Sequence, residues 1–200
     1  MNRRFLIERI IPLLIFLALW LFNWFAPLLL LPLFFLPFVY VIFIEKKAIS
    51  YLGFRKGGLQ YSLYLGSSFS VLLMAVYYFV FIIHYFDIEH EIPSIYGVFA
   101  NVIWLPLYEE VAFRGFFLSH FSDSSFSAWT KRNLTVNLFQ SVLYLSVYTY
   151  YLVTSAYFML VPIFLLSFLN GIIFQMTRNI YGCLLTHSAF NAFMLFLSLV

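Results

Sequence analysis

The chain has 200 residues, of which 64% are hydrophobic and only 10% are charged. A soluble domain of this size carries roughly 25% charged residues, so this chain has too little polar surface to cover a water-soluble body. The composition therefore excludes an ordinary soluble domain and predicts a polytopic all-α membrane bundle, with residues 1–200 forming a single transmembrane domain. The expected surrounding is a lipid bilayer, and no nucleic-acid partner is expected.

Seven apolar segments follow one another along the chain, each near the ~20 residues that a helix needs to cross hydrocarbon. They cover residues 10–26, 27–44, 61–84, 95–118, 134–152, 156–176 and 180–200. The first two segments are short and predict a tight helical hairpin over about 10–44. One long tilted element with an interfacial piece is the alternative. The loop at 45–60 mixes cations with Tyr, Leu and Phe, which indicates either a short interfacial segment or a solvated loop.

The basic residues predict the orientation of these spans. If the N-terminus is cytoplasmic and there are seven spans, all 11 Lys and Arg residues belong to the inner side. The outer loop at 85–94 carries Asp87, Glu89 and Glu91 instead. Cytoplasmic loops are enriched in Lys and Arg, so this asymmetry favours an N-terminus inside and a C-terminus outside.

Two adjacent carboxylates, Glu109 and Glu110, interrupt the apolar segment 95–118, and Arg114 follows them. A charge near the centre of a bilayer costs roughly 3 kcal/mol on insertion scales, so intramembrane charges usually serve a function. Glu110 and Arg114 are spaced i,i+4 and share a helix face, where they can pair. Glu109 projects about 100° away around the helix and lacks that partner. The pattern predicts one clamped carboxylate and one that is available as a proton acceptor; an ion pair that only fixes helix packing is the alternative.

A second polar pair, His187 and Asn191, lies in the last apolar segment, again spaced i,i+4 on one face. Histidine can donate a hydrogen bond, accept a proton or bind a metal, and asparagine can donate to a developing oxyanion. Hydrogen bonding between helices is the alternative role for this pair. The other buried polar residues, among them Asn101, Asn170 and Gln175, are interpreted as packing contacts.

These motifs together resemble a known family. Glu109-Glu110-x-x-x-Arg114 followed by His187-x-x-x-Asn191 is similar to the type II CAAX prenyl endopeptidase and bacteriocin-processing family of intramembrane proteases, also called the CPBP or Abi family. The resemblance covers roughly residues 50–198. It implies peptide-bond hydrolysis in a polar cavity that opens to the cytoplasm, on a peptide or membrane-protein substrate, in a bacterial cytoplasmic membrane. It also implies that Glu109 activates water, that Arg114 holds Glu110, and that His187 and Asn191 stabilise the oxyanion.

One departure from the family pattern concerns its middle motif, Phe-x-x-x-His. The matching residues here are Tyr144 and Tyr148, so Tyr148 stands at the position of the histidine. Members of the family are classed as metalloproteases, and a divalent metal such as zinc is a candidate cofactor, with Glu109 and His187 as candidate ligands. A phenol is a poor base and a poor ligand, because its ordinary pKa is about 10. A complete zinc site is therefore not expected.

Three functions remain open on the sequence alone. The first is an intramembrane peptidase. The second is a non-catalytic member of the same family that binds a membrane partner, for example in bacteriocin immunity or as a scaffold. The third is a transporter or channel, which ranks last because no internal repeat is evident.

Overall fold

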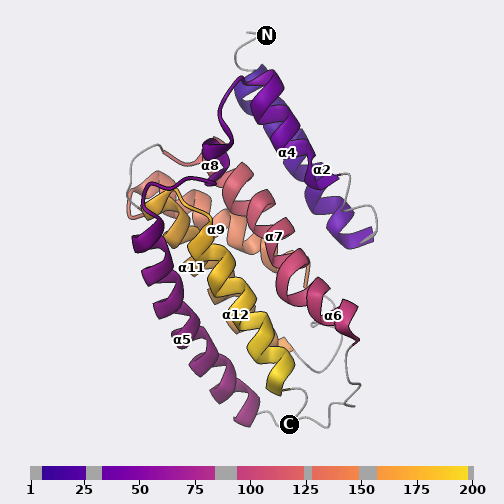
Figure 1. The fold of residues 1–200 in the computed structure, drawn as a ribbon, viewed down its shortest axis with the longest axis vertical. Coiled ribbons are helices and arrows are strands. Elements are labelled where there is room, and N and C mark those ends of the chain that lie inside the picture. The colour runs from indigo at the N-terminus through magenta and orange to yellow at the C-terminus, as the bar shows by residue number, and fades with distance from the viewer. Residues whose placement is uncertain (1–5, 26–32, 84–93, 124–127, 149–156, 198–200) are drawn as a thin grey trace.

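The computed structural model describes residues 6–25, 33–83, 94–123, 128–148 and 157–197. All regular structure in these ranges is helical, and the long helices run lengthwise along the molecule (Figure 1). The elements in chain order are η1 Leu6–Ile10, α2 Ile11–Phe25, α4 Leu36–Val39, η3 Tyr40–Ile44, η4 Ile49–Leu52, α5 Leu59–Ile83, α6 Ile95–Phe99, η5 Ala100–Trp104, α7 Leu105–Glu110, η6 Val111–Leu118, α8 Ser119–Phe121, α9 Lys131–Ser146, η7 Tyr157–Met159, α11 Leu160–Thr177 and α12 Tyr181–Leu197. The prediction of an all-helical chain is confirmed.

Each predicted apolar segment contains a helix within the described ranges, and the segment ends that are described differ from the helix ends by a few residues. Residues 26–32, 84–93, 149–156 and 198–200 lie outside the described ranges, and with them the predicted acidic loop with Asp87, Glu89 and Glu91. Segment 95–118 is part of a continuous helix over residues 95–121, in which α-helical turns alternate with wider π-helical turns. By length and composition, two helices of the described ranges can cross a membrane, Leu59–Phe79 and Tyr157–Thr177, and the apolar helix Tyr181–Leu197 is shorter. The count of seven spans therefore stays a prediction.

Helix α9 is polar on its inner face and apolar on its outer face. Its buried side chains include Asn133, Asn137 and Gln140, all 0% exposed, whereas Phe139 and Val142 are 55% and 58% exposed. A helix of a soluble protein has the reverse arrangement, because water favours polar groups on the surface. This inverted pattern is what a lipid surrounding favours.

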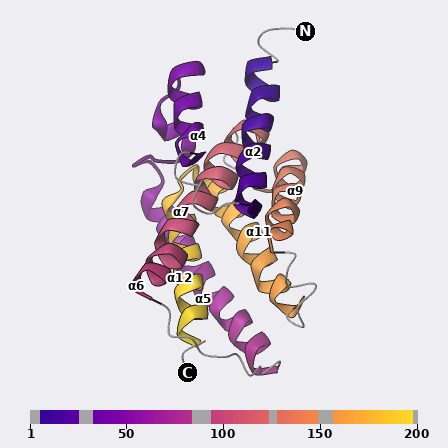
Figure 2. The same cartoon turned by 90° about the vertical axis from the view of Figure 1, so that its right-hand side faces the viewer.

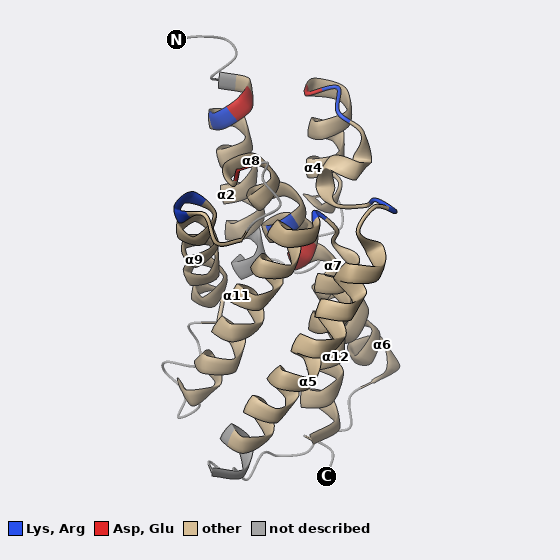
Figure 3. Ribbon diagram, turned by 90° about the vertical axis from the view of Figure 1, so that its left-hand side faces the viewer, with Lys and Arg blue, Asp and Glu red and all other residues tan. Residues whose placement is uncertain are grey.

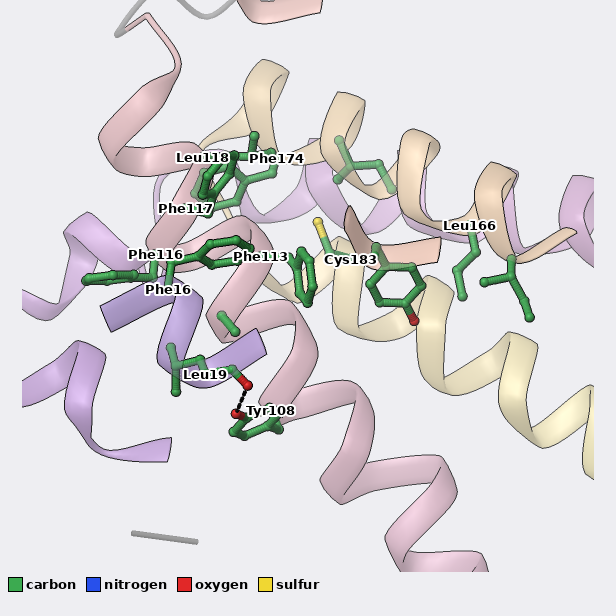
Figure 4. Packing of buried hydrophobic residues seen from close by; sticks show 14 of the residues in the cluster. Phe16, Leu19, Tyr108, Phe113, Phe116, Phe117, Leu118, Leu166, Phe174 and Cys183 are labelled. Atoms are coloured by element: carbon green, nitrogen blue, oxygen red, sulfur yellow. Dashed lines mark hydrogen bonds between the residues drawn. The ribbon is translucent and has the colours of Figure 1, made fainter. Parts of the chain in front are cut away.

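The N-terminal helices pack on the upper end of the 95–121 helix. Helix α2 and the α4–η3 segment both contact this helix and stand apart on either side of it (Figure 2). Figure 4 shows Phe16 of α2 among the phenylalanines of η6, with ring centroids 5.2 Å from Phe113 and 4.5 Å from Phe117. Tyr108 donates a hydrogen bond to the carbonyl oxygen of Leu19 at 2.9 Å. Aromatic packing thus positions the helix that carries the two glutamates.

Helices α5 and α12 approach closely because small residues line their contact. The backbone N–H of Gly182 donates to Ser62 Oγ at 3.0 Å, and Thr186 Oγ1 donates to the carbonyl oxygen of Gly66 at 3.1 Å. A Cβ atom on Gly182 would overlap the backbone carbonyl of Ser62. This contact fixes the position of α12, which carries His187.

We expect Gly182→Ala to destabilise the protein by about 1–3 kcal/mol or more, because an added methyl group meets backbone atoms that cannot rotate away. Thermal unfolding in detergent measures the change. Ser68→Ala, on the exposed face of α5, is the matched control and leaves the melting temperature unchanged. Equal melting temperatures for the Gly182 variant and the wild type would contradict the close packing.

A buried ion pair joins the loop after η3 to the end of the 95–121 helix. His120 Nε2 lies 3.1 Å from Glu45 Oε2, and Arg9 donates to the carbonyl oxygen of His120 at 2.7 Å. Lys47 Nζ also lies 3.3 Å from Glu45. Burial raises the pKa of Glu45, but the hydrogen bond and charge of His120, together with Lys47, outweigh this and lower that pKa below its ordinary value.

This lowered pKa has a consequence for stability. A carboxylate whose pKa is lower in the folded state stabilises the protein above its unfolded pKa of about 4.3, and the contribution is lost as the pH falls through the folded pKa. We expect Glu45→Gln to lower the melting temperature at pH 7 by about 3 °C or more, as for the loss of a charge-assisted hydrogen bond. The difference should shrink as the pH falls below about 4.3 and disappear only below the lowered pKa of Glu45 in the folded state. An equal difference in melting temperature between wild type and Glu45→Gln at pH 7 and at low pH would contradict a stabilising role of the Glu45–His120 contact.

Candidate active site

The two glutamates lie about halfway along the 95–121 helix, at the end of α7. In Figure 3 the red segment of α7 and an adjacent blue segment lie deep in the bundle, whereas the lower lengths of α5, α11 and α12 carry neither colour. Glu109 is 1% exposed and Glu110 is 0% exposed. Charged groups this deeply buried need partners, because their transfer from water costs several kcal/mol per ion.

Glu110 is held by three side chains from three elements. Arg114 Nη1 lies 3.2 Å from Glu110 Oε1, so the ion pair predicted from the i,i+4 spacing is present. Asn170 of α11 donates to the same oxygen at 2.9 Å, and His187 Nδ1 of α12 lies 2.8 Å from it. Glu110 is therefore a fixed carboxylate that ties α11 and α12 to the 95–121 helix.

Arg114 is held in turn by α11. Its Nη2 donates to the carbonyl oxygen of Ser167 at 2.9 Å and to Ser167 Oγ at 3.0 Å. The guanidinium carbon also lies 5.1 Å from the centre of the Tyr144 ring, within the range of a cation–π contact. The cation cannot swing away from Glu110 without breaking these contacts.

Glu109 contacts two hydroxyl groups, one from α9 and one from the turn that follows it. Tyr144 donates a hydrogen bond to Glu109 Oε2 at 2.7 Å, and the Tyr148 hydroxyl lies 3.3 Å from both carboxylate oxygens. His187 Nε2 lies 3.6 Å from Glu109 Oε2. Glu109 was predicted to lack Arg114 as a partner on its own helix face, and these contacts come from side chains outside the 95–121 helix. A 100° rotation around one helix separates Glu109 from Arg114, but it does not separate Glu109 from side chains of other helices.

His187 connects the two carboxylates, with one ring nitrogen directed at each. Because Nδ1 lies within hydrogen-bond distance of Glu110, this bond fixes the orientation of the ring, as second partners of histidine generally do. Nε2 then points towards Glu109 and lies 3.4 Å from the Tyr144 hydroxyl. The two carboxylates thus share a single imidazole and have different surroundings, an arrangement suited to acid–base chemistry.

The predicted site residues do not all meet. Glu109, Glu110, Tyr148 and His187 lie in one cluster, to which Arg114 is joined through Glu110. Asn191 is one helical turn beyond His187, and its amide donates to the backbone carbonyl of Asn101 at 2.8 Å. The expected cavity, open to water, is closed around the carboxylates, and the half-buried Tyr148 is the most exposed member of the cluster.

Two members of the cluster were not predicted as site residues. Tyr144 was noted only as the counterpart of a phenylalanine, and Asn170 was interpreted as a packing residue. The i,i+4 spacing of Tyr144 and Tyr148 predicts that both lie on one helix face, and the two hydroxyls are 3.3 Å apart although Tyr148 lies in the turn just after α9. No comparable pattern marks Asn170, because its contact with Glu110 depends on how α11 is positioned along the 95–121 helix.

A zinc ion is a poor match to these side chains. Glu109 Oε2 and His187 Nε2 could serve as two ligands, but a catalytic zinc ion takes three protein ligands. No group of three His, Cys, Asp or Glu side chains suited to a metal ion occurs in the ranges that the structure describes. The next neighbours are the hydroxyls of Tyr144 and Tyr148, which are not the usual ligands of zinc, so we assign no step of the chemistry to a metal.

The fold and the site define a class of protein, an all-helical protein with helices long and apolar enough to cross a membrane and with two carboxylates and a histidine buried between its helices. The chain belongs to a family within this class, described as type II CAAX prenyl endopeptidase Rce1-like, whose model matches residues 91–193. This match covers slightly more than half of the chain, includes every candidate site residue and makes the protein a member of a membrane-embedded protease family. No curated protein and no solved structure matches the chain.

Proposed function

We propose that this protein is an intramembrane peptidase that hydrolyses a peptide or a membrane-protein segment with water activated by Glu109. The observation that supports this most is the connection of Glu109 to Glu110 through the two ring nitrogens of His187. A proton acceptor and a possible oxyanion donor thus lie side by side. The family match over the same residues supports the choice of peptide hydrolysis over transport.

The reaction needs one water molecule and returns Glu109 to its starting state. The water transfers a proton to Glu109 while its oxygen attacks the carbonyl carbon of the scissile bond. The tetrahedral intermediate then carries a negative oxygen, to which Nε2–H of a doubly protonated His187 donates, while its Nδ1–H stays on Glu110. When the C–N bond breaks, the proton held by Glu109 passes to the leaving nitrogen, and the products are a carboxylic acid and an amine.

The remaining residues keep these groups in place. Arg114 and Asn170 hold Glu110, and Glu110 orients His187 through Nδ1. Asn191 is i,i+4 from His187, and we propose that it donates to the same oxyanion once it releases the carbonyl of Asn101. Because the carboxylates are buried, substrate and water reach Glu109 past the half-buried Tyr148.

We propose a multi-pass arrangement with seven spans, the N-terminus inside and the C-terminus outside, in a bacterial cytoplasmic membrane. Consecutive helices alternate in direction through the bundle, so the basic loops at 45–58 and 128–132 and the turn at Arg178 lie towards one end (Figure 1, Figure 3). This grouping supports a cytoplasmic location for that end. The site would then be approached from the cytoplasmic half of the bilayer.

The test is a cleavage assay with purified protein in lipid nanodiscs. The substrates are peptides that end in Cys-aliphatic-aliphatic-X, with and without a farnesyl group, and an unmodified membrane-protein terminus, with products identified by mass spectrometry. Cleavage of any of these peptides by the wild type, and not by Glu109→Gln, supports the proposal. Peptides that bind to the protein and remain intact would instead favour a non-catalytic, partner-binding member of the family.

A further inference from the structure

The hydroxyl of Tyr144 contacts three other side chains of the candidate site. It lies 2.7 Å from Glu109 Oε2, 3.3 Å from the Tyr148 hydroxyl and 3.4 Å from His187 Nε2. The shortest of these three contacts is the one to Glu109. A phenol is a better donor than acceptor towards a carboxylate, so its single proton is committed to Glu109.

The two tyrosines, Tyr144 and Tyr148, differ in how deeply they are buried. Tyr144 is 1% exposed and is packed on both sides, with its ring edge-to-face against Phe113 and the Arg114 guanidinium over its face. Tyr148 is only half-buried, and its hydroxyl lies at the longer distance of 3.3 Å from both Glu109 oxygens. One tyrosine is therefore fixed, whereas the other lies on the side from which a substrate can approach.

The two oxygens of Glu109 also differ. Oε2 is the oxygen that contacts the Tyr144 hydroxyl, and His187 Nε2 lies 3.6 Å from it, whereas the Tyr148 hydroxyl lies 3.3 Å from both oxygens. A carboxylate that is held through one oxygen keeps a defined rotamer. Tyr148 is equally distant from both oxygens and therefore does not select between them.

From these contacts we infer that Tyr144 is the positioning residue of Glu109, which holds the carboxylate through Oε2 in the orientation that takes the proton from water, while Tyr148 contacts the incoming substrate. This inference rests on the proposed peptidase function. It assigns separate roles to two tyrosines, one on α9 and one in the turn after it. A purely structural role would require only the shape of the Tyr144 ring and not its hydroxyl proton.

The experiment distinguishes the contribution of the Tyr144 ring from that of its hydroxyl proton, which it donates to Glu109. Tyr144→Phe keeps the ring and removes the donor, whereas Tyr144→4-aminophenylalanine keeps an N–H donor in nearly the same place. We expect the Phe variant to lose about 10–100-fold in kcat with KM changed less than threefold, as for the misplacement of a general base. The 4-amino variant should recover at least a tenth of the wild-type kcat. For Tyr148→Phe we expect the larger change in KM.

A second measurement does not depend on activity. With 3-fluorotyrosine at residue 144, the fluorine resonance should shift when Glu109 is changed to Gln and stay unchanged for Asp123→Asn, a distant carboxylate. A wild-type kcat for Tyr144→Phe, no recovery with the 4-amino variant, or no fluorine shift would each overturn the inference. If the wild type cleaves no peptide, the peptidase function fails, and the fluorine measurement still decides whether Tyr144 holds Glu109.

Discussion

Glu109→Gln should abolish peptide cleavage while the protein remains folded. The amide has nearly the shape of the carboxylate and can still meet Tyr144 and Tyr148, but it cannot accept a proton from water. General base catalysis contributes about 10²–10⁴-fold, and a loss of at least this size is expected in kcat. Cleavage rates at saturating peptide, with the melting temperature measured on the same sample, provide the test.

The matched control for this change is Asp123→Asn, the same isosteric substitution at a carboxylate that is 34% exposed and paired with Arg132. This variant should cleave at the wild-type rate. A Glu109→Gln variant within tenfold of the wild type would show that Glu109 is not the base. Loss of activity in both variants would show that the assay responds to charge in general.

Arg114→Leu should produce the largest loss of stability of any single substitution at the site. It leaves the Glu110 carboxylate buried without its cation, and breaking a buried pair in this way costs about 3–5 kcal/mol. The loss of the contacts with Ser167 adds to this cost. Thermal or denaturant unfolding in detergent measures the effect.

A surface pair of the same chemistry gives the comparison. Arg132 Nη1 lies 2.9 Å from Asp123 Oδ1, closer than Arg114 lies to Glu110, but its side chain is 49% exposed. Exposed ion pairs contribute about 0–1 kcal/mol, so Arg132→Leu should change the stability little. Similar losses for the two variants would mean that burial does not determine the importance of the Glu110–Arg114 pair.

The sequence could predict features that depend on one helix at a time. Apolar runs located the helices, and the i,i+4 spacing identified the pairing of Glu110 with Arg114, because both residues belong to the same helix. The buried polar face of α9 could also have been predicted from the sequence, because Asn133, Asn137 and Gln140 recur at helical spacing.

Contacts between helices could not be read in the same way. Tyr144 lies 35 residues from Glu109, and Asn170 lies 60 residues from Glu110 along the chain. Whether such residues meet depends on how far each helix is shifted and rotated against the next. Close contacts such as that of Gly182 with Ser62 determine how far the helices are shifted. The periodicity of one helix does not predict such contacts with another helix. For the same reason Asn191 was expected beside His187 in the cluster, whereas its amide reaches Asn101.

The central claim is that water activated by Glu109 attacks a peptide bond. The most direct measurement is cleavage in water enriched in the heavy isotope of oxygen, followed by mass spectrometry of the product. The wild type should place heavy oxygen in the newly formed carboxyl group of the product, and Glu109→Gln should give no labelled product. Products without heavy oxygen at the cleavage site, or labelled products formed equally by the Glu109 variant, would contradict this account.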